Sequence, residues 1–131
     1  MTSPALSLPD AAEMAEALIA CPSVTPASGM VFDCLADMLE PLGFVIHRAV
    51  SGEPPDGPVE NLFAIRRGPE GSRHFAFAGH LDVVPPGDGW QSGPFAPERK
   101  GNLLYGRGAV DMKGSIAAMV AAVRDIPADA G

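Results

Sequence analysis

The sequence has few features of a membrane protein, a nucleic-acid-binding protein or a secreted protein. Its 131 residues include 9 lysines and arginines against 16 acidic residues, and this formal net charge of −7 argues against nucleic acid or an anionic membrane as partner. No apolar run approaches the roughly 18 residues that a membrane-spanning helix needs. The first ten residues, MTSPALSLPD, have neither a basic start nor a long apolar stretch. They therefore do not predict a secretory signal, and we expect a cytoplasmic protein.

Cysteine is scarce, whereas glycine and proline are abundant. The two cysteines, Cys21 and Cys34, do not form a CxxC pair, so we expect reduced packing residues rather than a disulfide or a metal pair. The 15 glycines and 14 prolines separate apolar segments, which indicates turns and loops. With 47% apolar residues, the chain is suited to one globular domain with a core.

Apolar periodicity predicts three helices and four strands. Ser7 is the predicted N-cap of the first helix, with Pro9 and Asp10 in its first turn. The helices are expected before Pro22 and over about residues 30–40 and 112–125, and the strands over about residues 44–50, 62–66, 75–81 and 103–108. This order predicts an α/β fold in which helices flank a layered sheet.

The last predicted helix is unusually apolar. One stripe is formed by larger side chains, and most of the remaining surface is alanine: Ile116, Met119, Val120 and Val123, with alanines at 117, 118, 121 and 122. A helix that is apolar all round is normally buried on most sides. Since the sequence continues only a few residues beyond this helix, we expect it to be part of a larger protein.

The apolar segment "FAFAGHLDVV", residues 75–84, contains a histidine and an aspartate two positions apart. On a strand, His80 and Asp82 would point to the same side, and open α/β sheets form sites beyond the carboxyl ends of their strands. A metal-bound imidazole usually donates its other N–H to an acceptor, often a carboxylate, so this pair can supply a ligand and its orienting group. The spacing fits a structural polar pair at a strand end equally well.

A second candidate is "YGRGAVDMKGS", residues 105–115, whose glycines allow close backbone approach. Asp111 precedes the last predicted helix, and it fits either a helix N-cap or a metal ligand that the fold brings to His80. A phosphate-binding loop is excluded because the order Lys-Gly-Ser is not Gly-Lys-Ser and the glycines do not follow GxGxxG.

The other histidines do not complete a metal site. His74 would lie roughly 20 Å from His80 along a strand, and His47 is expected to face solvent. A catalytic zinc ion needs about three protein ligands. His80 and Asp111 alone cannot provide them, so the residues leave the site unfinished.

Four motifs together carry a family resemblance: "PSVTP", "NLFAIRRG", "GHLDVVPPGDGWQSGPFAP" and "GNLLYGRGAVDMKGSIAAMV". They resemble the co-catalytic zinc amidohydrolases and peptidases, which include succinyl-diaminopimelate desuccinylase, acetylornithine deacetylase, aminoacylase and glutamate carboxypeptidase. Within that family the motifs are most similar to the desuccinylases. The arginine–alanine form of "GRGAVDMKGS" favours that group over the acetylornithine deacetylases, which are the alternative.

The resemblance implies roles for three residues. His80 is implied as a ligand of one zinc ion, Asp82 as the catalytic carboxylate that orients His80, and Asp111 as the carboxylate that bridges two zinc ions, with cobalt as an alternative metal. The peptide bond between Asp111 and Met112 is implied to be cis. The implied reaction is hydrolysis of an N-acyl amide, with N-succinyl-LL-2,6-diaminopimelate as the expected substrate of lysine and diaminopimelate biosynthesis in bacteria.

The resemblance also implies that residues 1–131 are the N-terminal portion of the catalytic domain. The family's catalytic glutamate, its remaining metal ligands and the domain through which these enzymes form homodimers would lie beyond Gly131. We therefore expect no turnover from this chain alone. A non-catalytic fold or an interaction module is the alternative from another class.

Overall fold

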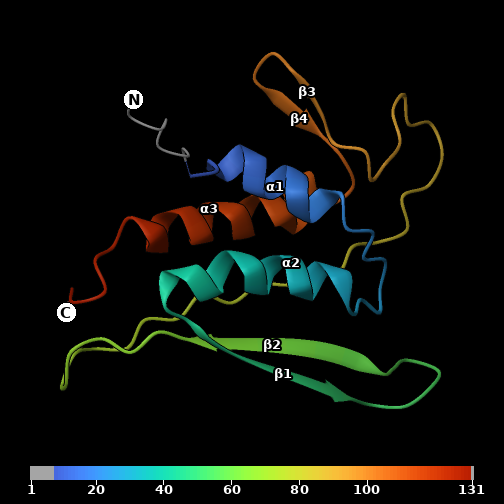
Figure 1. The fold of residues 1–131 in the computed structure, drawn as a ribbon. Helices are drawn as coiled ribbons and strands as arrows, with labels where there is room; N and C mark the ends of the chain where they lie inside the picture. The colour runs from blue at the N-terminus through green and yellow to red at the C-terminus, as the bar shows by residue number, and fades with distance from the viewer. Residues whose placement is uncertain (1–7, 131) are drawn as a thin grey trace, which may run out of the picture.

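The computed structural model describes residues 8–130 as stacked layers of helices and two small sheets (Figure 1). At the top of Figure 1 lies the β3–β4 hairpin (Glu98–Lys100 and Leu103–Tyr105). Below it lie α1 (Ala11–Ile19) and α3 (Gly114–Arg124) as a pair, followed by α2 (Met30–Leu39). The β1–β2 hairpin (Val45–Ser51 and Val59–Ile65) forms the last layer. The predicted α/β class is confirmed, with each sheet two-stranded and antiparallel. Within residues 8–130, no helix has the length and apolar character needed to cross a bilayer.

Helix α1 begins after Asp10, which is its N-cap. The Asp10 carboxylate accepts the Glu13 N–H at 2.8 Å, and the Glu13 carboxylate accepts the Asp10 N–H at 2.9 Å. This reciprocal pair satisfies two N–H groups at the helix start, so the chain begins its helix here. Pro9 therefore lies before the helix rather than in its first turn, and the predicted cap Ser7 lies outside the described residues.

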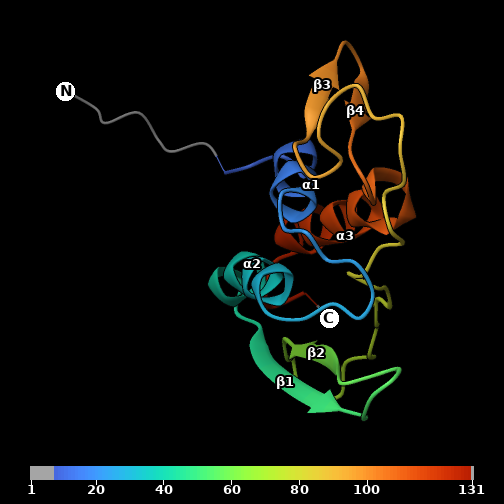
Figure 2. The ribbon, with the colours of Figure 1, turned by 90° about the vertical axis from the view of Figure 1, so that its right-hand side faces the viewer.

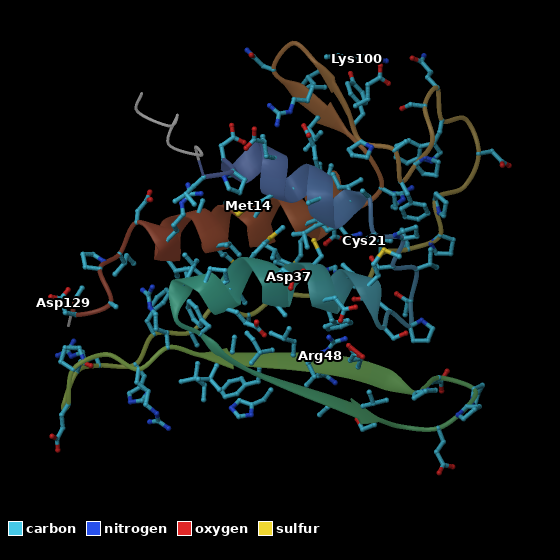
Figure 3. The ribbon with its side chains drawn as sticks, in the orientation of Figure 1. Met14, Cys21, Asp37, Arg48, Lys100 and Asp129 are labelled. Carbon is cyan, nitrogen blue, oxygen red and sulfur yellow. The ribbon has the colours of Figure 1, made fainter. Side chains whose placement is uncertain are left out.

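The three helices enclose two apolar clusters. Figure 3 shows Met14 between α1 and α3, and Cys21 at the end of α1. One cluster joins Leu18, Cys21, Ala27, Val31, Phe32, Leu81 and Ile116. The other joins Met14, Ala15, Leu39, Ala117 and Val120. Both cysteines are free, which confirms the expectation of packing residues.

The β1–β2 hairpin packs one face against the helices. Its register pairs Val45 with Ile65 and Ser51 with Val59, so β2 begins earlier than the sequence predicted. Side chains of β2 alternate, and Leu62 and Ala64 pack on the helical core, whereas Phe63 is exposed. His47 is exposed on β1, as predicted.

Arg48 connects this hairpin to α2. Its side chain points from β1 toward α2 (Figure 3) and forms ion pairs with Asp33 of α2 and Glu60 of β2. The guanidinium also lies 5.8 Å from the centroid of the Phe32 ring. These contacts fix the hairpin under the helix layer.

The predicted strand over residues 75–81 is wrong. Within residues 8–130 no segment pairs with it, and it runs as an extended trace past the helices toward the β3–β4 hairpin (Figure 2). Phe75 is 82% exposed and Phe77 is 47% exposed. A β-strand requires a neighbour for its N–H and C=O groups, and an apolar run does not specify that neighbour. Pairing begins only at Val83, in a parallel bridge with Val24.

The chain between β4 and α3 also differs from expectation. The sequence predicted a strand at β4 but not its partner β3, whose residues are all charged. Helix α3 begins at Gly114 rather than at Met112, because Asp111 and Met112 adopt non-helical backbone angles in the turn η2 (Ala109–Lys113). Ala118 and Ala122 remain exposed, so α3 is not covered on all sides by residues 8–130.

Candidate metal centre

The imidazole of His80 has an acceptor at each ring nitrogen. Nδ1 lies 2.9 Å from the backbone carbonyl oxygen of Asp82 and 3.3 Å from Oδ1 of its carboxylate. Nε2 lies 3.0 Å from Oδ1 of Asp111. A carbonyl oxygen only accepts, so Nδ1 carries a hydrogen. When the ring is neutral, Nε2 has a lone pair that points toward Oδ1 of Asp111, which is also an acceptor. A cation between these two atoms would interact favourably with each of them.

The protonation equilibrium of His80 reflects this arrangement. The hydrogen bond to the backbone carbonyl of Asp82 and the neighbouring Asp111 carboxylate raise the pKa of the His80 imidazole. A proton on Nε2 is thus one cation that the site favours. A divalent metal ion would use the same lone pair and compete with that proton.

The donor set of His80 and Asp111 suits a divalent metal ion. Imidazole nitrogen and carboxylate oxygen bind zinc at about 2.0–2.2 Å, so two ligands of one tetrahedral ion lie about 3.4 Å apart. The observed separation of Nε2 and Oδ1 is 3.0 Å, so these two atoms would move apart by a few tenths of an ångström to hold the ion. The other ring nitrogen, Nδ1, is hydrogen-bonded to Asp82, and such a hydrogen bond is usual for a metal-bound histidine. Within residues 8–130, however, no three His, Cys, Asp or Glu side chains gather closely enough to hold a metal.

Close backbone packing brings Asp111 to this place. A Cβ atom at Gly106 would lie 2.5 Å from Cγ2 of Ile19, so the chain after β4 passes directly over α1. Gly108 has φ +87°, and the peptide bond between Asp111 and Met112 is cis, as the resemblance implied. Helix α3 begins at Gly114, and its N-cap position is occupied by Lys113 rather than by Asp111. The interpretation of Asp111 as an ordinary N-cap is therefore wrong.

The segment that carries His80 and Asp82 is held by the loop after α1. The Ser23 hydroxyl donates to the carbonyl of Leu81 at 2.7 Å, and the Thr25 hydroxyl donates to Oδ2 of Asp82 at 2.5 Å. Neither hydroxyl residue was predicted from the sequence as part of the site. Their alternation in "PSVTP" is a period-two pattern, which is typical of an extended segment alongside another strand.

The three predicted residues lie at one cavity of about 430 Å³. Its more apolar walls are Val83, Val84, Leu103, Leu104, Tyr105 and Val110. His47 and His74 are exposed elsewhere and do not line it. The structure thus brings His80, Asp82 and Asp111 together at a space open to a ligand, and their roles as metal ligands and orienter stay predictions.

Comparison with known proteins gives matches along nearly the whole chain. Residues 76–130 match the profile of Peptidase family M20/M25/M40. A succinyl-diaminopimelate desuccinylase of Novosphingobium aromaticivorans is 80% identical over 122 residues, which cover 93% of this chain and 32% of that protein. Proteins of the same name from Erythrobacter litoralis and Sphingopyxis alaskensis are 67% and 66% identical, over 92% and 93% of this chain and 33% and 32% of theirs. The chain spans about a third of the length of these curated relatives.

Proposed function

We propose that this chain is part of a member of peptidase family M20/M25/M40, whose profile matches residues 76–130, and that His80, Asp82 and Asp111 form part of the dinuclear metal centre of an amide hydrolase. The proposed reaction removes the succinyl group from N-succinyl-LL-2,6-diaminopimelate with one water, giving succinate and LL-diaminopimelate for lysine and diaminopimelate biosynthesis. The activity is proposed for a longer protein, since the relatives are about three times as long as this chain. The family resemblance implies that this longer protein would be a cytoplasmic homodimer.

The environment of His80 carries the proposal. Nδ1 donates to the carbonyl of Asp82 at 2.9 Å, and Nε2 faces a carboxylate oxygen of Asp111 at 3.0 Å. Two acceptors that face each other at this distance repel unless a cation lies between them. This arrangement supports the proposed cation site.

The described residues would divide the work at that site. His80 would bind one metal ion through Nε2, Asp82 would keep the hydrogen on Nδ1, and Asp111 would help to hold both ions. When bound, two zinc or cobalt ions would polarise the substrate carbonyl and lower the pKa of a water molecule. The carboxylates that line the cavity among residues 8–130, Asp82 and Asp111, both serve His80, so neither is free as a general base. We therefore expect no turnover from the chain alone.

A chimera tests the proposal. Residues 1–131 would replace the matching segment of the Novosphingobium aromaticivorans desuccinylase, which is 80% identical over 122 residues. With zinc present, we expect the chimera to release succinate from N-succinyl-LL-2,6-diaminopimelate, with a parallel assay on N-acetylornithine to test the alternative substrate. Residues 1–131 alone should release none.

Substitutions in the chimera separate the roles of the residues. His80→Ala and Asp111→Ala should abolish activity and metal retention, and Asp82→Ala should lower activity about 10- to 100-fold. His74→Ala is the matched control, because this histidine is exposed and does not line the cavity. A folded chimera that stays fully active with His80→Ala would contradict the proposal.

A further inference from the structure

The two carboxylate oxygens of Asp82 have different neighbours. Oδ1 lies 3.3 Å from Nδ1 of His80, whereas Oδ2 accepts the hydroxyl of Thr25 at 2.5 Å. The carboxylate is an acceptor, so the hydroxyl is the donor. A hydrogen bond from a hydroxyl to an ionised oxygen is short and strong compared with a neutral one. The hydroxyl therefore restricts rotation of the side chain that touches His80.

Thr25 is held in place by its own backbone rather than by this hydrogen bond. Its N–H donates to the carbonyl of Val83 at 3.1 Å, and the N–H of Val83 donates to the carbonyl of Ser23 at 2.9 Å. The buried Ser23 hydroxyl then binds the carbonyl of Leu81 at 2.7 Å. The backbone is thus anchored on both sides of Asp82.

With the backbone anchored, the orientation of the Asp82 side chain depends on its own hydrogen bonds. A β-branched threonine has few χ1 rotamers, so its hydroxyl has a defined direction. We propose that Thr25 is a positioning residue of the metal centre, which acts through Asp82 to present Nε2 of His80 to a metal ion. This inference rests on the proposed function, because it assigns a purpose to the orientation of His80.

The test uses Thr25→Val and Thr25→Ser in the chimera, because residues 8–130 alone do not supply the about three protein ligands that a zinc ion needs. Valine keeps the β-branched shape and removes the donor, whereas serine keeps the donor. Zn²⁺ is added, and its dissociation constant is read from the ring ¹⁵N resonances of His80 by NMR. We expect Thr25→Val to weaken Zn²⁺ binding about 10-fold, which is the lower end of the range for residues that orient a metal ligand. The effect is small because Thr25 is exposed, so a water molecule can partly replace the hydrogen bond that its hydroxyl donates to Asp82. Thr25→Ser should restore binding.

Ser72→Ala is the matched control. It removes a hydroxyl that donates to the carbonyl of Pro69 in a loop away from the cavity, so Zn²⁺ binding should be unchanged. A double variant with Asp82→Ala tests the route of the effect. If Thr25 acts through Asp82, Thr25→Val should have no further effect once Asp82 is alanine. An equal loss in both backgrounds would overturn the inference.

A second readout does not need the metal. In the neutral ring, the parent and Thr25→Ser should show hydrogen on Nδ1, and Thr25→Val should show an increased share on Nε2. Zn²⁺ binding that is unaffected by Thr25→Val would overturn the positioning role and leave the proposed function standing. A parent chimera whose His80 does not respond to Zn²⁺ would count against the proposed function, and the tautomer comparison would then decide the role of Thr25.

Discussion

Cys34 lies half-buried against the apolar cluster that joins α1 and α2. Burial, with neighbouring Cys21 and Asp37, raises the pKa of the Cys34 thiol from 9.0 to about 11. The folded chain therefore keeps this proton at pH values where the unfolded chain has lost it. Where the folded state binds more protons, the free energy of unfolding falls as the pH rises. Cys34 thus makes the fold sensitive to alkali, in a window between pH 9 and about 11.

We predict that stability decreases across this window by up to about 2 kcal/mol because of Cys34. Urea unfolding at a series of pH values, under a reducing agent, measures the free energy of unfolding. Cys34→Ala removes the titrating group, so the variant should lose less stability than the parent from pH 9 upward. If both proteins lose stability with the same slope, the effect comes from other groups.

Site residues were predictable from the sequence where a motif names them. His80, Asp82 and Asp111 belong to two motifs that carry the family resemblance, although H-x-D alone fits a structural pair equally well. Thr25 was not predictable, because the hydrogen bond to Asp82 joins residues 57 positions apart. A hydroxyl in a Pro-rich loop has no local pattern that names its partner.

The helices were predictable because their signals are local. Spacing of apolar residues and the ends at Pro22 and Gly43 depend on neighbours within a few positions. Strands depend on distant partners, so the apolar segment 75–81 was predicted as a strand that the described residues do not pair. For the same reason β3, Glu98–Lys100, was missed, since its charged residues form a strand only by pairing with β4.

Gly108 joins β4 to the turn that carries Asp111, and it combines two requirements. Its φ is +87°, and a Cβ atom there would lie 2.6 Å from Cγ1 of Val83 and 3.3 Å from Cδ of Lys113. Gly87 also has a positive φ, +71°, but a Cβ atom would find nothing within 4 Å. Alanine at either position would have to adopt an unfavourable positive φ. Only Gly108→Ala would also place a Cβ atom too close to its neighbours.

Gly108→Ala should therefore lower the free energy of unfolding by about 1–3 kcal/mol more than Gly87→Ala does. Urea unfolding of the two variants and the parent, at one pH, measures the difference. Comparable losses would mean that Val83 and Lys113 move aside without cost. In that case the glycine at 108 is required for its backbone angle alone.

Residues 8–130 expose several large apolar side chains. Among them are Phe75 and Phe77 of the extended segment 75–79, whose rings are in edge-to-face contact with their centroids 5.0 Å apart. An apolar segment whose N–H and C=O groups lack partners is a template for pairing with another chain.

We expect the purified chain to self-associate through this segment as its concentration rises. Phe77→Lys should suppress the association, because a charged side chain blocks edge pairing. Sedimentation velocity over a concentration series measures the effect. Phe63→Lys is the matched control: Phe63 is 64% exposed but lies on β2, which is already paired with β1. This control should associate like the parent. Equal suppression by both substitutions would mean that the added charge, rather than pairing of residues 75–79, controls the association. Slow hydrogen exchange at residues 75–79 in dilute samples would contradict an unpaired segment.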